Sequence, residues 1–221
     1  MISPLVTAHS EGSEGNDGSG DYGCVKGEPL CVAWLFSYPA ERTADLQVPK
    51  YDAPAKPAID RVVNYHVETR GVLSADLEEF KTLSSQTLND PRGWVKMGIS
   101  FKEVETGGDF TLVLAEAAQV AAFSPGCSAE YSCNVGRYVI INQDRWLGAT
   151  PAWNSGGGSL RDYRHMVVNH ETGHWLGHGH RNCGGAGQPA PVMQQQSIDL
   201  QGCVFNPWPT KAELYSPRLG I

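Results

Sequence analysis

The sequence predicts an α+β fold, in which a β-sheet and two helices are followed by a smaller, loop-rich lobe. From residue 60 onward, apolar residues recur in short β-type runs that are separated by segments with helical periodicity. After residue 177 the chain is rich in Gly, Pro and Gln and shows no clear period. We therefore expect a single domain over residues 24–221, with an upper lobe over about 24–177 and a lower lobe over about 178–221.

The N-terminal part differs in composition. Residues 1–23 include SEGSEGNDGSGDYG, which is almost entirely small, polar or acidic, so we expect a flexible segment there. VAWLFSYP (32–39) is a candidate strand, and the proline-rich stretch 48–59 is typical of an extended connector.

The regular elements follow in order from residue 60. A helix is expected to begin at Ser74 as N-cap and to continue to Leu88, because acidic residues fill its first turn and apolar residues recur at helical spacing. Runs rich in β-branched and aromatic residues predict strands on either side of this helix: 61–69, 94–104, 109–116 and 137–146.

A second, longer helix is expected to start at Ser159, with Asp162 three residues later in a capping-box arrangement. Gly177 is expected to end it in a left-handed conformation. Apolar residues on its inward face lie in register with His170 and His174, which places both histidines at the edge of the core. These apolar residues are Leu160, Tyr163 and Val167.

Composition excludes several classes of partner. The net charge is -7 and no basic cluster is present, which argues against nucleic acid and anionic membranes. No run of eighteen apolar residues occurs, so no membrane-spanning segment is expected. We expect a monomer.

Six cysteines fall into three local pairs, which favours three short-range disulfides and an oxidising, extracytoplasmic location. The alternative is six buried thiols in a cytosolic protein. MISPLVTAHS, the first ten residues, has neither the basic residues nor the apolar core of a signal peptide, so secretion is inferred from the cysteines and from the resemblance described below. The expected pairs are Cys24–Cys31, Cys127–Cys133 and Cys183–Cys203.

The stretch HETGHWLGHGH (170–180) carries metal-site chemistry. His170 and His174 are four residues apart on a helix, so both can reach one ion. Because Gly177 breaks the helix, His180 can supply a third ligand from the turn. Glu171 can then accept a proton from a zinc-bound water. His178 is expected to be exposed or to support the site without being a ligand.

These residues fill the spacing H-E-x-x-H-x-x-G-x-x-H, and Met193 follows in PAPVMQQQS. At this point the sequence resembles the metzincin zinc endopeptidases, in which a Met-containing turn lies under the histidines. It looks still closer to an exported actinobacterial family of metzincin-like proteins. That second resemblance covers roughly residues 60–215 and is carried by segments that include LNDPRGW, INQDRW, ATPAWN, GQPAPVMQQQSIDLQGC and FNPWP.

The resemblance implies a metzincin-like α+β fold with a twisted mixed sheet, a backing helix and an active-site helix, and a Met-turn at Met193. It implies one catalytic Zn²⁺ held by His170, His174 and His180, with Glu171 assisting attack of the zinc-bound water on a peptide bond. It also implies that a peptide binds in extended form beside an edge strand. The segment 137–146 is a candidate for that strand, and the alternative is that 137–146 is the neighbouring inner strand. Several metzincins carry a Tyr after the Met-turn, whereas Gln194 to Gln196 follow here.

Two other functions remain open at this stage. One is a zinc amidase that acts on cell-wall peptide, and the other is an inactive, zinc-stabilised binding module. The carboxylate of Glu171 argues against the second, because a purely structural metal site gains nothing from it.

Overall fold

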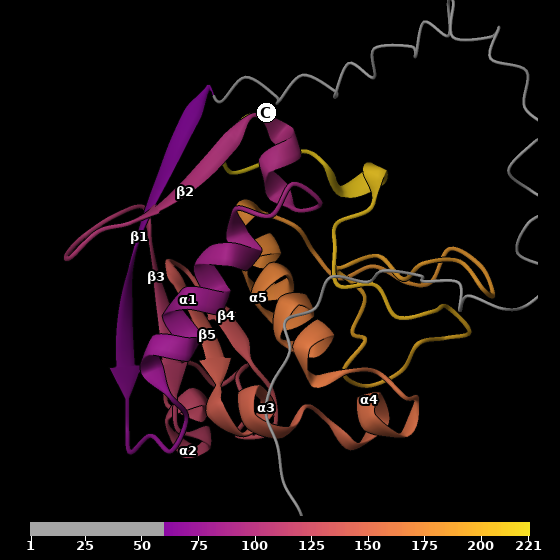
Figure 1. Cartoon of the computed structure of the whole chain (residues 1–221), viewed down its shortest axis with the longest axis horizontal. Helices are drawn as coiled ribbons and strands as arrows, with labels where there is room; N and C mark the ends of the chain where they lie inside the picture. The colour runs from indigo at the N-terminus through magenta and orange to yellow at the C-terminus, as the bar shows by residue number, and fades with distance from the viewer. Residues whose placement is uncertain (1–59) are drawn as a thin grey trace, which may run out of the picture. The chain divides into compact units, whose positions relative to one another are not determined.

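A computed structural model describes residues 60–221 of the chain (Figure 1). The predicted flexible segment 1–23, the candidate strand 32–39 and the predicted Cys24–Cys31 disulfide lie outside the described residues.

A five-stranded sheet forms the centre of the described region, with the strand order β2-β1-β3-β5-β4. The neighbouring strands are parallel except β4 and β5, which are antiparallel, so the sheet is mixed, as predicted. The edge strand at one side is β4, and the predicted strand 137–146 is therefore its inner neighbour. The strands are β1 (Arg61–Arg70), β2 (Ile99–Glu103), β3 (Phe110–Ala115), β4 (Cys133–Val135) and β5 (Tyr138–Asn142).

Side chains of β3 and β5 alternate between two apolar layers, as the two-residue period of a strand requires. Leu112 and Ile141 belong to the larger core cluster, which contains residues of α1 (Leu77–Leu88) and α5 (Leu160–Leu176). Val113 and Ile140 belong to a smaller cluster with Val120 of α2 (Ala117–Ala121). Figure 1 shows α1 and α5 on the same side of the sheet. The central strand is thus buried on both faces, which explains its continuous apolar sequence.

The first helix matches the prediction, but the predicted N-cap, Ser74, is wrong. Asp76 caps α1, and its Oδ1 accepts hydrogen bonds from the backbone N–H groups of Glu78 and Glu79. Ser74 instead donates its backbone N–H to Oε1 of Gln143, far away in the chain. The cap moves two residues because an Asp side chain satisfies the same orphan N–H groups and Ser74 is held by a tertiary contact.

The predicted strand 94–104 is also partly wrong. Trp94–Met97 forms a 3-10 turn, η1, and Gly98 follows with φ 78°, so β2 begins only at Ile99. A residue in the left-handed region ends a turn and cannot lie within a regular strand. The fully buried Trp94 ring, which donates its Nε1–H to the carbonyl of Asn169 in α5, holds η1 against the long helix.

The predicted strand 137–146 ends early, at Asn142, because a helix begins there. The side chain of Asn142 accepts a hydrogen bond from the N–H of Asp144 and caps α3 (Gln143–Gly148). A further short helix, α4 (Pro151–Ser155), is capped by Thr150. Neither helix was predicted, because five or six residues are too few to show a helical period.

The long helix α5 has the predicted ends. Ser159 is its N-cap and accepts the N–H of Asp162 through Oγ, while Gly177 follows Leu176 with φ 104°. Beyond Gly177, the only regular element of the described residues is a 3-10 turn, η2 (Lys211–Glu213). The predicted disulfides Cys127–Cys133 and Cys183–Cys203 are both present.

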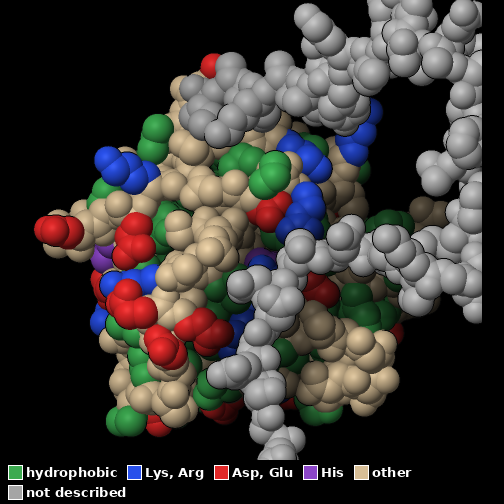
Figure 2. All heavy atoms as spheres, viewed as in Figure 1, with side chains coloured by type: hydrophobic (Ala, Val, Ile, Leu, Met, Phe, Trp, Pro, Cys, Tyr) green, Lys and Arg blue, Asp and Glu red, His purple; other side chains and the backbone are tan. Residues whose placement is uncertain are grey.

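Acidic and basic side chains are interspersed over α1 on the face shown in Figure 2. Three ion pairs of the described residues involve this helix: Lys81 with Glu78, Lys81 with Glu103 of β2, and Arg164 of α5 with Glu79. Across residues 60–221, no helix has the length and apolar character needed to cross a bilayer.

Candidate metal centre

The last two turns of α5 and the turn after it bring three histidines together. His170 and His174 project from one face of the helix because they are four residues apart. The left-handed Gly177 reverses the chain, and a Cβ at this position would lie 3.1 Å from the Arg218 backbone nitrogen. His180 therefore turns back over the helix end and joins the other two rings.

The ligand nitrogens of the three rings converge on one point. The Nε2 atoms of His174 and His170 are 3.2 Å apart, and those of His174 and His180 are 3.1 Å apart. All three ligand atoms lie within 4.8 Å of one another. His170 is buried, His174 is half-buried and His180 is exposed, so the cluster opens to solvent on the His180 side.

Backbone carbonyls set the tautomers of two rings. Nδ1 of His170 donates to the carbonyl of Val192 at 2.8 Å, and Nδ1 of His174 donates to the carbonyl of His178 at 2.9 Å. A carbonyl oxygen can only accept, so each proton lies on Nδ1 and each Nε2 carries a lone pair. The Gly177 turn thus supplies both the third ring and the carbonyl that orients the second.

This arrangement fits a metal ion. Two Nε2 lone pairs that face each other at 3.2 Å have no proton between them, and they repel unless a cation lies between the rings. Two nitrogens bound to one tetrahedral zinc at about 2.0–2.1 Å lie about 3.3 Å apart, which is close to the separations found here. Burial, and next the neighbouring His174, lowers the pKa of His170 to about 3, so its imidazole is neutral at physiological pH. The cluster can hold a metal ion.

Glu171 lies beside the cluster, in the wall of the same cavity. It is buried, and burial raises the pKa of its carboxyl group to about 8. A carboxylate whose pKa lies near neutrality can take up and release a proton under physiological conditions, as general acid and base catalysts do.

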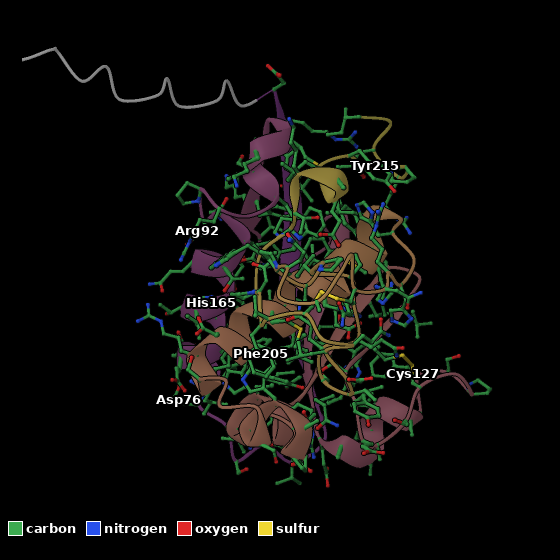
Figure 3. All side chains as sticks on the ribbon, turned by 90° about the vertical axis from the view of Figure 1, so that its right-hand side faces the viewer. Asp76, Arg92, Cys127, His165, Phe205 and Tyr215 are labelled. Carbon is green, nitrogen blue, oxygen red and sulfur yellow. A yellow bond between two sulfur atoms is a disulfide. The ribbon has the colours of Figure 1, made fainter. Side chains whose placement is uncertain are left out.

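A cavity of about 420 Å³ lies over the histidines and Glu171. The Cys127–Cys133 loop and the edge strand β4 form one wall, and residues 195–198 form another. The label of Cys127 in Figure 3 marks the side of the molecule on which this loop lies, opposite to the side that carries Asp76 and His165.

Met193 lies in a turn that packs against α5 at Gly173, next to His174. The N–H of Gln194 donates to the carbonyl of Pro191 at 3.0 Å and closes the turn. Met193 is fully buried, and its Sδ is so near Gly173 of α5 that a Cβ at Gly173 would lie 2.3 Å from it. The glycine inside the helix is therefore explained by close approach of this turn.

The other histidines of residues 60–221 and the glutamines after Met193 lie outside the cluster. His178 is buried, stacks on Trp94 and donates Nε2–H to the carbonyl of Tyr215 at 2.8 Å. His165 packs against α1 and bonds to Oγ1 of Thr87, and His66 bonds to Glu68. Of the three glutamines, only Gln194 does not line the cavity.

One buried residue near the site escaped the sequence analysis. Glu213 is fully buried and accepts the backbone N–H groups of Val192 and Met193. The signal that could have found it is the capping-box spacing of Thr210 and Glu213, which encloses only a 3-10 turn.

Comparisons with known proteins add the following. No curated protein matches the chain by sequence. Among solved structures, the chain is similar to the crystal structure of archaemetzincin from Methanopyrus kandleri, with 13% identity and a TM-score of 0.41 over 69% of this chain and 91% of that one. Residues 46–210, most of the chain, match the model of the family described as "Protein of unknown function (DUF3152)", and the chain therefore belongs to that family.

Proposed function

We propose that the protein is a zinc-dependent endopeptidase. The observation that carries the proposal is the convergence of three imidazole nitrogens, two of them with tautomers set by the backbone, beside a buried carboxylate in one solvent-open cavity. A structural zinc site is closed by four protein ligands, whereas a catalytic one has three and leaves a position for water or substrate. Across residues 60–221, the cluster contains three possible ligands and no fourth.

His170, His174 and His180 would hold the ion through Nε2. Bound there, zinc supplies Lewis acidity, which lowers the pKa of a coordinated water towards neutrality and polarises a carbonyl oxygen. Glu171 takes the proton of the attacking water and delivers it to the amine that leaves. Met193, in the role of a Met-turn residue, supports the histidines from below.

The substrate we propose is a peptide in extended conformation. The edge strand β4 hydrogen-bonds only to β5 within the described sheet, and Cys133 and Asn134 of β4 line the cavity. A strand edge offers unpaired N–H and C=O groups to which an extended peptide can add. The sheet edge and the histidines thus face the same cavity, which gives a bound peptide a path past the metal site.

The test is cleavage of a peptide library by zinc-loaded protein, with and without chelator, alongside a peptidoglycan preparation. We expect wild type to cleave peptides, chelator to abolish cleavage, and Glu171→Gln to retain zinc while losing turnover. Glu105→Gln is the matched control, because Glu105 is exposed and does not line the cavity. Full activity of Glu171→Gln would refute the mechanism. Release of cell-wall peptide without library cleavage would identify an amidase, and zinc binding without either activity a binding module.

A further inference from the structure

Glu213 lies in η2, twenty residues after Met193, and is fully buried although it carries a carboxylate. Four donors satisfy it. Oε1 accepts the N–H of Met193 at 2.9 Å, and Oε2 accepts the N–H of Val192 at 3.1 Å together with the N–H and Oγ1–H of Thr210 at 2.8 and 2.7 Å. All four partners are donors, so the carboxylate acts only as an acceptor.

The bond to Met193 has a direct connection to the metal site. The N–H of Met193 and the C=O of Val192 belong to the same peptide unit. Glu213 accepts the N–H of that unit, and the Val192 carbonyl of the same unit accepts Nδ1–H of His170 at 2.8 Å. A continuous hydrogen-bond chain therefore runs from the Glu213 carboxylate through one peptide group to the ring of His170.

We propose that Glu213 is a positioning residue that tunes and orients His170 through the Val192–Met193 peptide; this inference rests on the metal centre proposed above. In many metal sites a carboxylate accepts the second N–H of a ligating histidine directly, which fixes the tautomer and raises the basicity of the ligand nitrogen. Here one peptide group stands between them. The carboxylate polarises that peptide, which makes the Val192 carbonyl a stronger acceptor for Nδ1–H of His170.

A further hydrogen bond links the Met193 turn to the other side of the site. The carbonyl of Met193 accepts the N–H of Arg181 at 3.0 Å, and Arg181 directly follows His180. Glu213 holds the Pro191–Val192 and Val192–Met193 peptides directly, and it is connected to the Met193 carbonyl only through the bond from the N–H of Gln194 to the carbonyl of Pro191. Without the carboxylate, the buried N–H groups of Val192 and Met193 would lose their partner, and the turn would have to rotate to satisfy them.

The test is the zinc affinity of the full chain, measured by competition with a chromophoric chelator. Glu213→Gln keeps the shape but turns one acceptor into a donor, and we expect it to weaken zinc binding about tenfold or more, the range seen when outer-shell partners of metal ligands are removed. The matched control is Thr210→Val, which removes one donor to the same carboxylate and leaves both bonds to the turn. It should lower stability without changing zinc affinity. Cobalt(II)-loaded Glu213→Gln should also show shifted visible absorption bands.

The outcomes separate the two proposals. Absence of zinc binding by wild type would overturn the metal centre and this inference together. Wild-type affinity in Glu213→Gln would overturn the positioning role alone, as would an equal loss in Thr210→Val, which would trace the effect to general loosening of the lobe.

A measurement on wild type keeps the proposal testable if Glu213→Gln does not fold. In an NMR titration with zinc, the amide proton of Met193 should move more than that of Val192. Both donate to Glu213, but only the Met193 amide shares a peptide unit with the carbonyl that binds His170. Equal movement of the two signals, or a zinc-loaded His170 protonated at Nε2, would contradict the proposal.

Discussion

Gly173→Ala tests whether the Met193 turn is packed against α5 as closely as the structure shows. Gly173 lies in the last turn of α5, one residue before His174. An added Cβ would lie 2.3 Å from Sδ of Met193 and 3.0 Å from Cζ2 of Trp94. Both side chains are fully buried, so neither has open space into which to retreat.

Two opposing effects decide the size of the change. Replacing a helical Gly by Ala stabilises a helix by about 1 kcal/mol. Overpacking a well-packed core costs about 1–3 kcal/mol, and contact with two buried neighbours places this site at the upper end. We expect a net loss of about 2 kcal/mol in the free energy of unfolding, or about 4–8 °C in Tm for a chain of this size.

Thermal and urea unfolding of the zinc-loaded protein measure this loss. Gly148→Ala is the matched control, because Gly148 ends the helix α3 and a Cβ there would meet nothing within 4 Å. The control should be as stable as wild type or slightly more stable. If Gly173→Ala behaves like Gly148→Ala, Met193 does not contact the helix as described.

A double variant tests the same contact without relying on an absolute value. Met193→Ala alone should cost about 2–5 kcal/mol, because it leaves a cavity in the core. In the double variant Gly173→Ala/Met193→Ala the clash with Sδ is gone. Its loss of stability should therefore be smaller than the sum of the losses of the two single variants, by about 0.5–3 kcal/mol. Strict additivity would refute the close approach.

Three further predictions concern the metal, the disulfide and pH. Chelation should lower Tm, because an ion that binds only the folded state stabilises it, and a Tm indifferent to chelator would argue against the site. Reduction of Cys183–Cys203 should remove roughly 3 kcal/mol from the lobe around Met193 and weaken zinc binding before the sheet unfolds; zinc affinity that survives strong reductant would contradict this. Burial lowers the pKa of His165, so the folded state binds its proton less readily than the unfolded state. Stability should therefore fall as pH drops below about 6.5, and in urea titrations His165→Gln should flatten that slope, which an unchanged slope would disprove.

The parts of the structure that depend on local geometry could be predicted from the sequence. The spacing of His170 and His174, the cap at Ser159 and the break at Gly177 all follow from helix geometry within one or two turns. The disulfides Cys127–Cys133 and Cys183–Cys203 also link cysteines that are near each other in the chain. Local rules were enough to predict three converging histidines.

Features that depend on distant contacts could not be predicted. Ser74 and Asp76 are both good caps by type, and only the bond of Ser74 to Gln143, 69 residues away, shows why Asp76 is the one used. The link between Glu213 and His170 passes through a peptide group, which leaves no trace in residue types. A 3-10 turn at Trp94–Met97 in place of a strand likewise reflects the burial of Trp94 against α5.

The central claim is that His170, His174 and His180 hold one zinc ion and leave a position open, and X-ray absorption at the zinc edge tests it most directly. Wild type should show three imidazole nitrogens and one further light atom at about 2.0–2.1 Å, and His180→Ala should lose one imidazole. Spectra that contain a sulfur ligand, or that keep three imidazoles in His180→Ala, would contradict the account.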